Sequence, residues 1–218
     1  METSGTLEKI IHYWDDYAPQ FDEAHSTEDL TKWKETLKDL LGAETGSVLD
    51  LGTGTGFLAK MTAELGYTTT GVDLSRNMLD ILRAEIEQRG LNIKLIEAPV
   101  ENLPFLDCSF DAIINCRLVW TLIDPQVSFT EWRRVLKSGG KVINFIRIRE
   151  ENDPGMMKEV YGEAVDNSLP LRNAGKGLLE KSLEQAGFAA CEAIPLPREL
   201  TVKDEGLPRW YAVQGVKP

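Results

Sequence analysis

Two short stretches of the chain carry the residue types of a nucleoside-binding site. The first, VLDLGTGTGFLA over residues 48–59, is typical of a buried strand, a glycine turn and the start of a helix. Glycines let such a turn reverse tightly and bring backbone N–H groups against a ligand. The second, GVDLS over residues 71–75, is typical of a strand that ends on Asp73, whose carboxylate can accept two hydrogen bonds from a ribose diol. Together the two stretches predict a nucleoside-binding α/β domain.

The spacing of the glycines indicates which kind of nucleoside the turn accepts. Dinucleotide-binding folds favour G-x-G-x-x-G, in which a pyrophosphate sits on the helix N-terminus. Here the spacing is Gly52-x-Gly54-x-Gly56, and Asp50 comes just before the turn. A carboxylate beside the turn repels a pyrophosphate but attracts an ammonium group. The pattern therefore favours a nucleoside that carries an ammonium group.

With this pattern the chain resembles the class I S-adenosylmethionine-dependent methyltransferases, in particular their small-molecule, type 11-like branch. The first motif of that family has the form (V/I)LD(L/V)GxGxG, and its second strand ends in the ribose-binding acid. Three more segments support the resemblance: ENLPF at 101–105, SFDAII at 109–114 and WRRVLKSGGK at 132–141. The alternative, a strand–helix turn of some other doubly wound protein, is weaker because these segments follow in the family's order.

The rest of the chain alternates predicted strands and helices. We expect strands at 48–51, 68–73, 93–97, 110–115, 141–148, 190–195 and 210–215, and helices at 57–65, 75–89, 127–136 and 176–186. Alternation predicts an α/β fold with right-handed crossovers. The resemblance implies a doubly wound, Rossmann-like, seven-stranded sheet that is mostly parallel, with the last strand antiparallel. Ahead of it, amphipathic segments at 7–14 and 26–41 predict an N-terminal helical cover, with Ser26 as the N-cap of the second helix and Asp29 three residues later.

We expect a single methyltransferase domain, because no repeat or low-complexity tract divides residues 1–218. Its expected parts are the helical cover (1–46), the cofactor-binding core (47–148), a lid (149–175) and a C-terminal helix with strands (176–218). The lid segment has too many glycines and prolines for one long helix, and too many large apolar groups, Met156 and Met157 among them, for a solvated linker. Part of it should pack over the cofactor crevice together with residues 13–21.

The composition limits the partners and the compartment. The chain has 35 acidic and 24 basic residues, a formal net charge of −11, which disfavours nucleic acid as a substrate. It has no apolar stretch near about 18 residues and no secretory leader, so we expect no membrane span and a cytoplasmic location. Its three cysteines have no metal-ligand spacing, and no metal site is expected. Whether the chain is a monomer or a homodimer stays open.

The resemblance implies contacts for S-adenosylmethionine, whose product is S-adenosylhomocysteine. The cofactor-binding residues expected around the turn and the next strand are Asp50, Gly52, Thr53, Gly54, Gly56, Asp73, Leu74 and Met78. The turn should approach the methionyl portion, while Asp50 either orients the turn or reaches the ammonium group, directly or through water. Asp73 should hold the ribose hydroxyls. Leu74 and Met78 should wall the adenine, although Met78 suits the core equally well.

Adenine recognition departs from the family's pattern. In relatives the third strand ends in Gly-Asp-Ala-Glu, and its Asp accepts the adenine amine. Here the corresponding segment is Ala-Pro-Val-Glu over residues 98–101, and Pro99 cannot make that contact. The amine is therefore expected to meet Glu101 or a backbone carbonyl, while the Val100 N–H stays available.

Residues after the fourth strand and near the N-terminus complete the expected site. Asn115 and Cys116 should lie under the sulfonium, with the Asn115 carbonyl accepting from the methionyl ammonium. Arg117 could meet the methionyl carboxylate, a substrate acid or only solvent. Tyr13 and Trp14 resemble the N-terminal tract whose aromatic residue reaches over the cofactor in small-molecule methyltransferases, or they pack on the sheet. Trp120 suits the substrate pocket or a cation–π contact with the sulfonium.

The implied chemistry is an in-line displacement at the cofactor's methyl group, transferred to a small metabolite. Positioning supplies much of the acceleration, and a base is needed only for a neutral O–H or N–H nucleophile. No catalytic base is identified: His12 and His25 are the only imidazoles, and a surface or capping role suits each better. Two alternatives stay open, a cofactor-binding regulatory protein without turnover and a protein-modifying methyltransferase.

Overall fold

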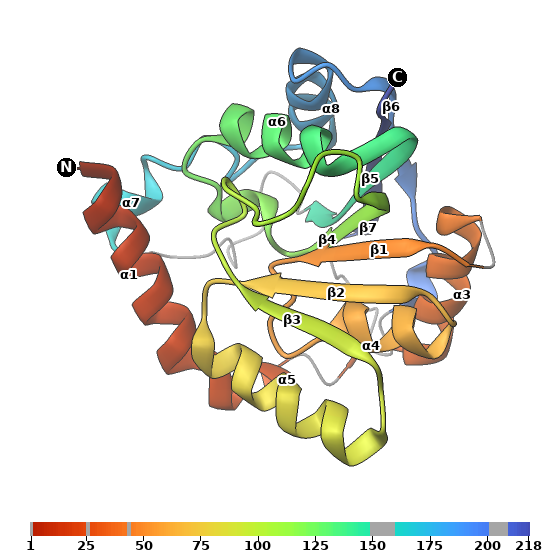
Figure 1. Cartoon of the computed structure of the whole chain (residues 1–218). Coiled ribbons are helices and arrows are strands. Elements are labelled where there is room, and N and C mark those ends of the chain that lie inside the picture. The colour runs from red at the N-terminus through yellow and green to blue at the C-terminus, as the bar shows by residue number, and fades with distance from the viewer. Residues whose placement is uncertain (1, 25–26, 43–44, 149–159, 201–208) are drawn as a thin grey trace.

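A seven-stranded sheet forms the centre of the computed structural model, which describes residues 2–24, 27–42, 45–148, 160–200 and 209–218 (Figure 1). The strands are β1 (Ser47–Leu51), β2 (Thr68–Asp73), β3 (Ile93–Glu97), β4 (Phe110–Cys116), β5 (Leu136–Ile148), β6 (Ala189–Pro195) and β7 (Arg209–Val216). Their order is β3-β2-β1-β4-β5-β7-β6. Strands β1 to β5 pair in parallel, and β7 runs antiparallel between β5 and β6. This topology confirms the predicted Rossmann-like sheet with an antiparallel last strand.

Helices cover both faces of the sheet. They are α1 (Glu2–Tyr17), α2 (Phe21–Ala24), α3 (Leu30–Leu41), α4 (Phe57–Glu64), α5 (Arg76–Arg89), α6 (Pro125–Val135), α7 (Glu163–Asp166) and α8 (Lys176–Gln185), with 3-10 turns at Ala18–Gln20, Val119–Thr121 and Arg198–Leu200. In Figure 1 α6 and α8 lie together on one side of the sheet, and α3 and α4 lie on the other. No helix in the described ranges combines the length and apolar character that a membrane crossing needs.

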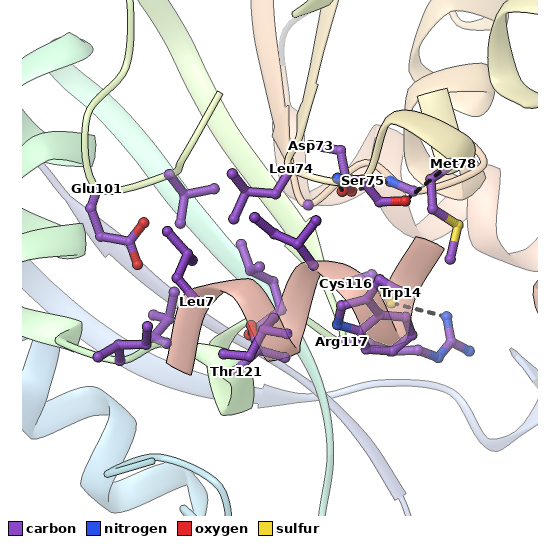
Figure 2. Close-up of a pocket in the computed structure, with 18 of the residues that line it drawn as sticks. Leu7, Trp14, Asp73, Leu74, Ser75, Met78, Glu101, Cys116, Arg117 and Thr121 are labelled. Carbon is purple, nitrogen blue, oxygen red and sulfur yellow. Dashed lines mark hydrogen bonds between the residues drawn. The ribbon is translucent and has the colours of Figure 1, made fainter. Parts of the chain in front are cut away.

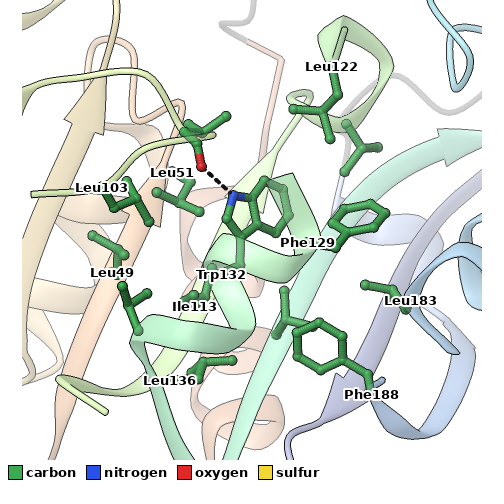
Figure 3. Close-up of a cluster of buried hydrophobic side chains, with 14 of the residues drawn as sticks. Leu49, Leu51, Leu103, Ile113, Leu122, Phe129, Trp132, Leu136, Leu183 and Phe188 are labelled. Atoms are coloured by element: carbon green, nitrogen blue, oxygen red, sulfur yellow. Dashed lines mark hydrogen bonds between the residues drawn. The ribbon is translucent and has the colours of Figure 1, made fainter. Parts of the chain in front are cut away.

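The strand period of two explains how one buried strand serves two cores. Val48 packs in the cluster with Trp33 of α3 and Leu58 of α4, whereas Leu49 packs in the cluster with Trp132 of α6. Figure 3 shows the second cluster, in which the Trp132 indole Nε1 donates to the Val100 carbonyl oxygen at 2.9 Å. This bond ties the loop after β3 to α6.

The start of α3 differs from the prediction. Asp29 is the N-cap, because its Oδ1 accepts from the backbone N–H groups of Thr31 and Lys32 at 3.0 and 3.1 Å. The predicted cap, Ser26, lies outside the described residues. The prediction that the helix begins there was wrong, because α3 begins at Leu30. The predicted end is correct: Gly42 takes the left-handed conformation directly after Leu41.

Candidate functional site

The glycine turn between β1 and α4 has three left-handed glycines with different surroundings. Gly52, Gly54 and Gly56 have φ values of 61°, 53° and 85°. A Cβ on Gly56 would lie 2.3 Å from Cδ1 of Leu82, so this glycine allows α4 to pack on α5. A Cβ on Gly54 would meet only the Met78 sulfur, at 4.0 Å. Gly54 therefore borders open space, and a side chain there would fill it.

Asp50 acts on the turn itself. Its carboxyl group is 2% exposed and accepts a hydrogen bond from Thr53 Oγ1 at 2.7 Å and another from the Ala59 backbone N–H. Burial raises the pKa of this carboxyl from 3.8 to about 7. Of the two roles expected for Asp50, the geometry supports orientation of the turn, while an ammonium contact stays a prediction.

Asp73 connects the turn to the start of α5. One oxygen of its carboxylate accepts from the Gly54 N–H at 2.7 Å, and the other accepts from the Ser75 N–H at 2.8 Å. Burial raises its pKa, and these backbone donors oppose that rise. The carboxylate faces the pocket beside the turn, where the sequence predicts the ribose contact.

A pocket of about 800 Å³, including the part open to solvent, lies at the carboxyl ends of β1, β2 and β4. The expected cofactor residues in its wall are Gly52, Gly54, Asp73, Leu74, Met78, Val100, Glu101 and Cys116 (Figure 2). Burial raises the pKa of the Cys116 thiol to about 12, so this group stays protonated.

Several expected residues lie outside that wall. Asp50, Thr53 and Gly56 do not line the pocket. The Asn115 side chain is fully buried, and its Nδ2 donates to Asn144 Oδ1 at 2.7 Å inside the sheet. The proposed role of its backbone carbonyl remains untested.

Three of the expected aromatic and imidazole groups lie outside the pocket wall. Tyr13 packs edge-on against Trp14 and Tyr161, with ring centroids 5.1 and 5.3 Å away, and Trp120 stacks on Tyr161 at 5.9 Å. The His12 side chain is 80% exposed beside Asp16, and His25 lies outside the described residues. Tyr13, Trp120 and His12 do not line the pocket, whereas Trp14 does.

Helix α1 contributes Trp14, which the sequence reasoning considered, and three residues that it missed, Leu7, Ile10 and Ile11. Leu7, Ile10, Ile11 and Trp14 line the pocket, and their spacing of i, i+3, i+4 and i+7 is the signal that could have identified this face. Asp15 then fixes the helix: its Oδ1 accepts from the Ser75 hydroxyl at 2.6 Å and from the Asn77 N–H at 3.2 Å. An acid on α1 thereby caps α5 next to Asp73.

Of the expected lid at 149–175, the structure describes residues 160–175, and a lid role stays a prediction. Tyr161, Val165 and Leu169 form a buried cluster with Ile10 of α1. The segment from 160 to 175 thus packs behind α1, and none of its residues lines the pocket. Met156 and Met157 lie outside the described residues.

The residues present fit S-adenosylmethionine. Gly54 leaves open space beside the pocket, Asp73 offers a carboxylate that can hold a ribose, and Leu74 and Met78 add apolar surface. Within the described ranges, no group of three His, Cys, Asp or Glu side chains could hold a metal ion.

Comparison with known proteins shows that methyltransferases are relatives of this chain. A family model described as "Methyltransferase domain" matches residues 49–144. A demethylmenaquinone methyltransferase from Renibacterium salmoninarum is 30% identical over 169 residues, which are 75% of this chain and 68% of that protein. A ubiquinone biosynthesis O-methyltransferase from Dinoroseobacter shibae is 30% identical over 183 residues, 78% of this chain and 73% of that protein.

The fold has a close counterpart among solved structures. The crystal structure of an S-adenosylmethionine-dependent methyltransferase from Aquifex aeolicus has a TM-score of 0.70, at 18% identity, over 94% of this chain and 98% of that one. At this identity the likeness concerns the fold alone. With the sequence relatives above, it establishes that the chain belongs to the class I S-adenosylmethionine-dependent methyltransferases of the type 11 branch.

Proposed function

We propose that this enzyme methylates a small, largely apolar metabolite that is enclosed beneath α1. The observation that carries the proposal is the pocket wall formed by Leu7, Ile10, Ile11 and Trp14. A wall of this kind excludes water and selects a ligand by its shape. When bound, the cofactor supplies a methyl group activated by a sulfonium leaving group.

The docking of α1 supports a small acceptor over a macromolecular one. Trp14 Nε1 donates to the Tyr161 hydroxyl at 2.9 Å, and Asp15 caps α5 on the neighbouring side. A peptide or a nucleic acid would have to displace these contacts to reach the pocket. The net charge of −11 also disfavours nucleic acid.

The reaction depends more on how the protein orients the acceptor and the cofactor than on proton transfer by a side chain. The carboxylate of Asp73 is committed to two backbone donors, so Glu101, whose pKa burial raises, is the carboxyl group of the described wall that is left to accept a proton. An acceptor that ionises easily, such as a hydroxylated aromatic ring, needs little help from a base. The two quinone-pathway relatives make this class the first to test.

Labelled methyl transfer tests the proposal. The purified chain would be incubated with methyl-labelled S-adenosylmethionine and, separately, with simple hydroquinones and catechols, with unfolded and folded proteins, and with tRNA. We expect label in the ring compounds alone. Label in protein at a comparable rate would overturn the enclosed-pocket proposal in favour of a protein-modifying enzyme.

Location and assembly are also proposals. Cys108, Cys116 and Cys191 are unpaired, as is typical of a reducing compartment, so we place the enzyme in the cytoplasm. For the assembly, the two states to be distinguished are a monomer and a homodimer. Light scattering together with activity at limiting protein concentration separates these two states.

A further inference from the structure

Arg117 has an unusual backbone at the carboxyl end of β4. Its φ is 62°, in the left-handed region that residues with a Cβ rarely adopt and that is enriched at functional sites. This conformation places the guanidinium over two aromatic rings, 5.4 Å from the Phe57 centroid and 4.8 Å from the Trp210 centroid. The rings hold the cation in a fixed position.

The guanidinium pairs with a buried carboxylate from the N-terminal cover. Arg117 Nη2 lies 2.6 Å from Glu28 Oε1, and the side chains are 16% and 3% exposed, respectively. Glu28 Oε2 also accepts from Trp33 Nε1 at 2.9 Å. Glu28 is therefore anchored by α3, independently of its partner.

The same guanidinium belongs to the pocket wall. Its Nη1 lies 3.3 Å from the Cys116 sulfur, and the next residue, Leu118, packs directly on Gly52 of the glycine turn. In Figure 2 Arg117 lies on the Met78 side of the pocket, and Glu101 lies on the opposite side. A cation is thus present beside the turn, at the end away from Glu101.

We propose that Arg117 binds the carboxylate of the amino-acid part of the cofactor, and that Glu28 competes with this carboxylate for the guanidinium. The inference rests on the cofactor-binding role of the pocket. The planar guanidinium suits carboxylates, and its aromatic neighbours keep it in place whichever carboxylate it pairs with. A second carboxylate beside Glu28 is repelled, so the charge of Glu28 weakens binding of the ligand.

Calorimetry with two ligands tests this arrangement. S-adenosylhomocysteine carries the carboxylate, whereas 5′-methylthioadenosine keeps the adenosine and thioether but lacks the amino-acid part. Arg117→Gln should weaken binding of S-adenosylhomocysteine by roughly tenfold or more, as for a lost charged hydrogen bond. Glu28→Gln should strengthen it severalfold. Neither change should alter binding of 5′-methylthioadenosine.

Opposite changes in affinity for S-adenosylhomocysteine would indicate competition between the two carboxylates. If the ion pair were purely structural, both substitutions would change this affinity in the same direction. Arg117→Lys keeps the charge and should retain part of the affinity, which guards against a folding defect in Arg117→Gln. Arg83→Gln, at an exposed ion pair with Asp80 on α5, is the matched control.

Two results would overturn the inference. One is unchanged affinity of Arg117→Gln for S-adenosylhomocysteine, which would leave an acidic group of the acceptor as the partner of Arg117. The other is weaker binding of both ligands in both variants, which would make the pair structural. Failure of the unaltered chain to bind either ligand would instead contradict the cofactor site itself.

Discussion

Asp50 makes the stability of the glycine turn depend on pH in a predictable direction. Burial raises the pKa of its carboxyl group from 3.8 to about 7 in the folded chain. Between these values the folded state holds a proton that the unfolded state has released. The contribution of Asp50 to stability is therefore complete below pH 3.8 and is lost as the pH rises through about 7. The full loss corresponds to roughly 4 kcal/mol.

Asp50→Asn removes this titration while keeping an oxygen that can accept from Thr53. Urea unfolding of the variant and the unaltered chain, measured from pH 4 to pH 8, gives the difference in free energy of unfolding. That difference should move in favour of the variant by up to about 4 kcal/mol across the range. The new amide can also change the free energy of unfolding by an amount that does not depend on pH. Such a change shifts the whole difference curve but leaves its slope against pH unaltered.

Asp111→Asn is the matched control for this experiment. Lys137 and Ser47 hold the pKa of Asp111 at about 2, below its ordinary value, so its contribution is lost only in acid. Its difference curve should be flat above about pH 5. A flat curve for Asp50→Asn, or one that favours the unaltered chain as the pH rises, would refute the reasoning.

Three further predictions concern the pocket. Gly54→Val should abolish binding of S-adenosylhomocysteine but lower the free energy of unfolding by only about 2 kcal/mol, as calorimetry and urea unfolding can show; full affinity would contradict it. Glu101→Gln should change the free energy of S-adenosylhomocysteine binding by less than about 1.5 kcal/mol if backbone groups bind the adenine amine, and a larger loss would show that Glu101 makes this contact. Hydrogen exchange should show α1 and residues 160–175 gaining protection together when S-adenosylhomocysteine binds, and protection of neither would contradict a shared cover.

Local signals explain why much of the fold could be predicted. The observed limits of β2 and β3 are those expected from the alternation of apolar runs and breakers. Helix α5 likewise begins after Ser75, whose hydroxyl accepts from the Met78 N–H, and ends at the left-handed Gly90. Each of these features depends on residues within a few positions of one another.

The start of α3 could not be predicted in this way. Ser26 and Asp29 are both suitable caps by residue type. Glu28, between them, is held by Trp33 and by Arg117, which is 89 positions away. A tertiary contact of that separation leaves no local pattern in the sequence.

In the candidate site, too, some residues could be predicted from local sequence and others depend on tertiary contacts. Gly54 and Asp73 could be predicted to border the pocket because the turn and the strand end carry their own spacing. The pocket face of α1 depends instead on how the helix docks. Tyr13 and Trp14 are both aromatic and differ by one position, and the contact of Asp15 with Ser75 turns Trp14 rather than Tyr13 toward the pocket.

The most direct test of the account is methyl transfer in a complex mixture. The chain would be incubated with methyl-labelled S-adenosylmethionine and an extract of its source cells, and the products would be separated by size. We predict label in the low-mass fraction, absent when Gly54→Val replaces the unaltered chain. Label confined to protein or nucleic acid, or label in the low-mass fraction that persists with Gly54→Val, would contradict a small-molecule methyltransferase that works through this pocket.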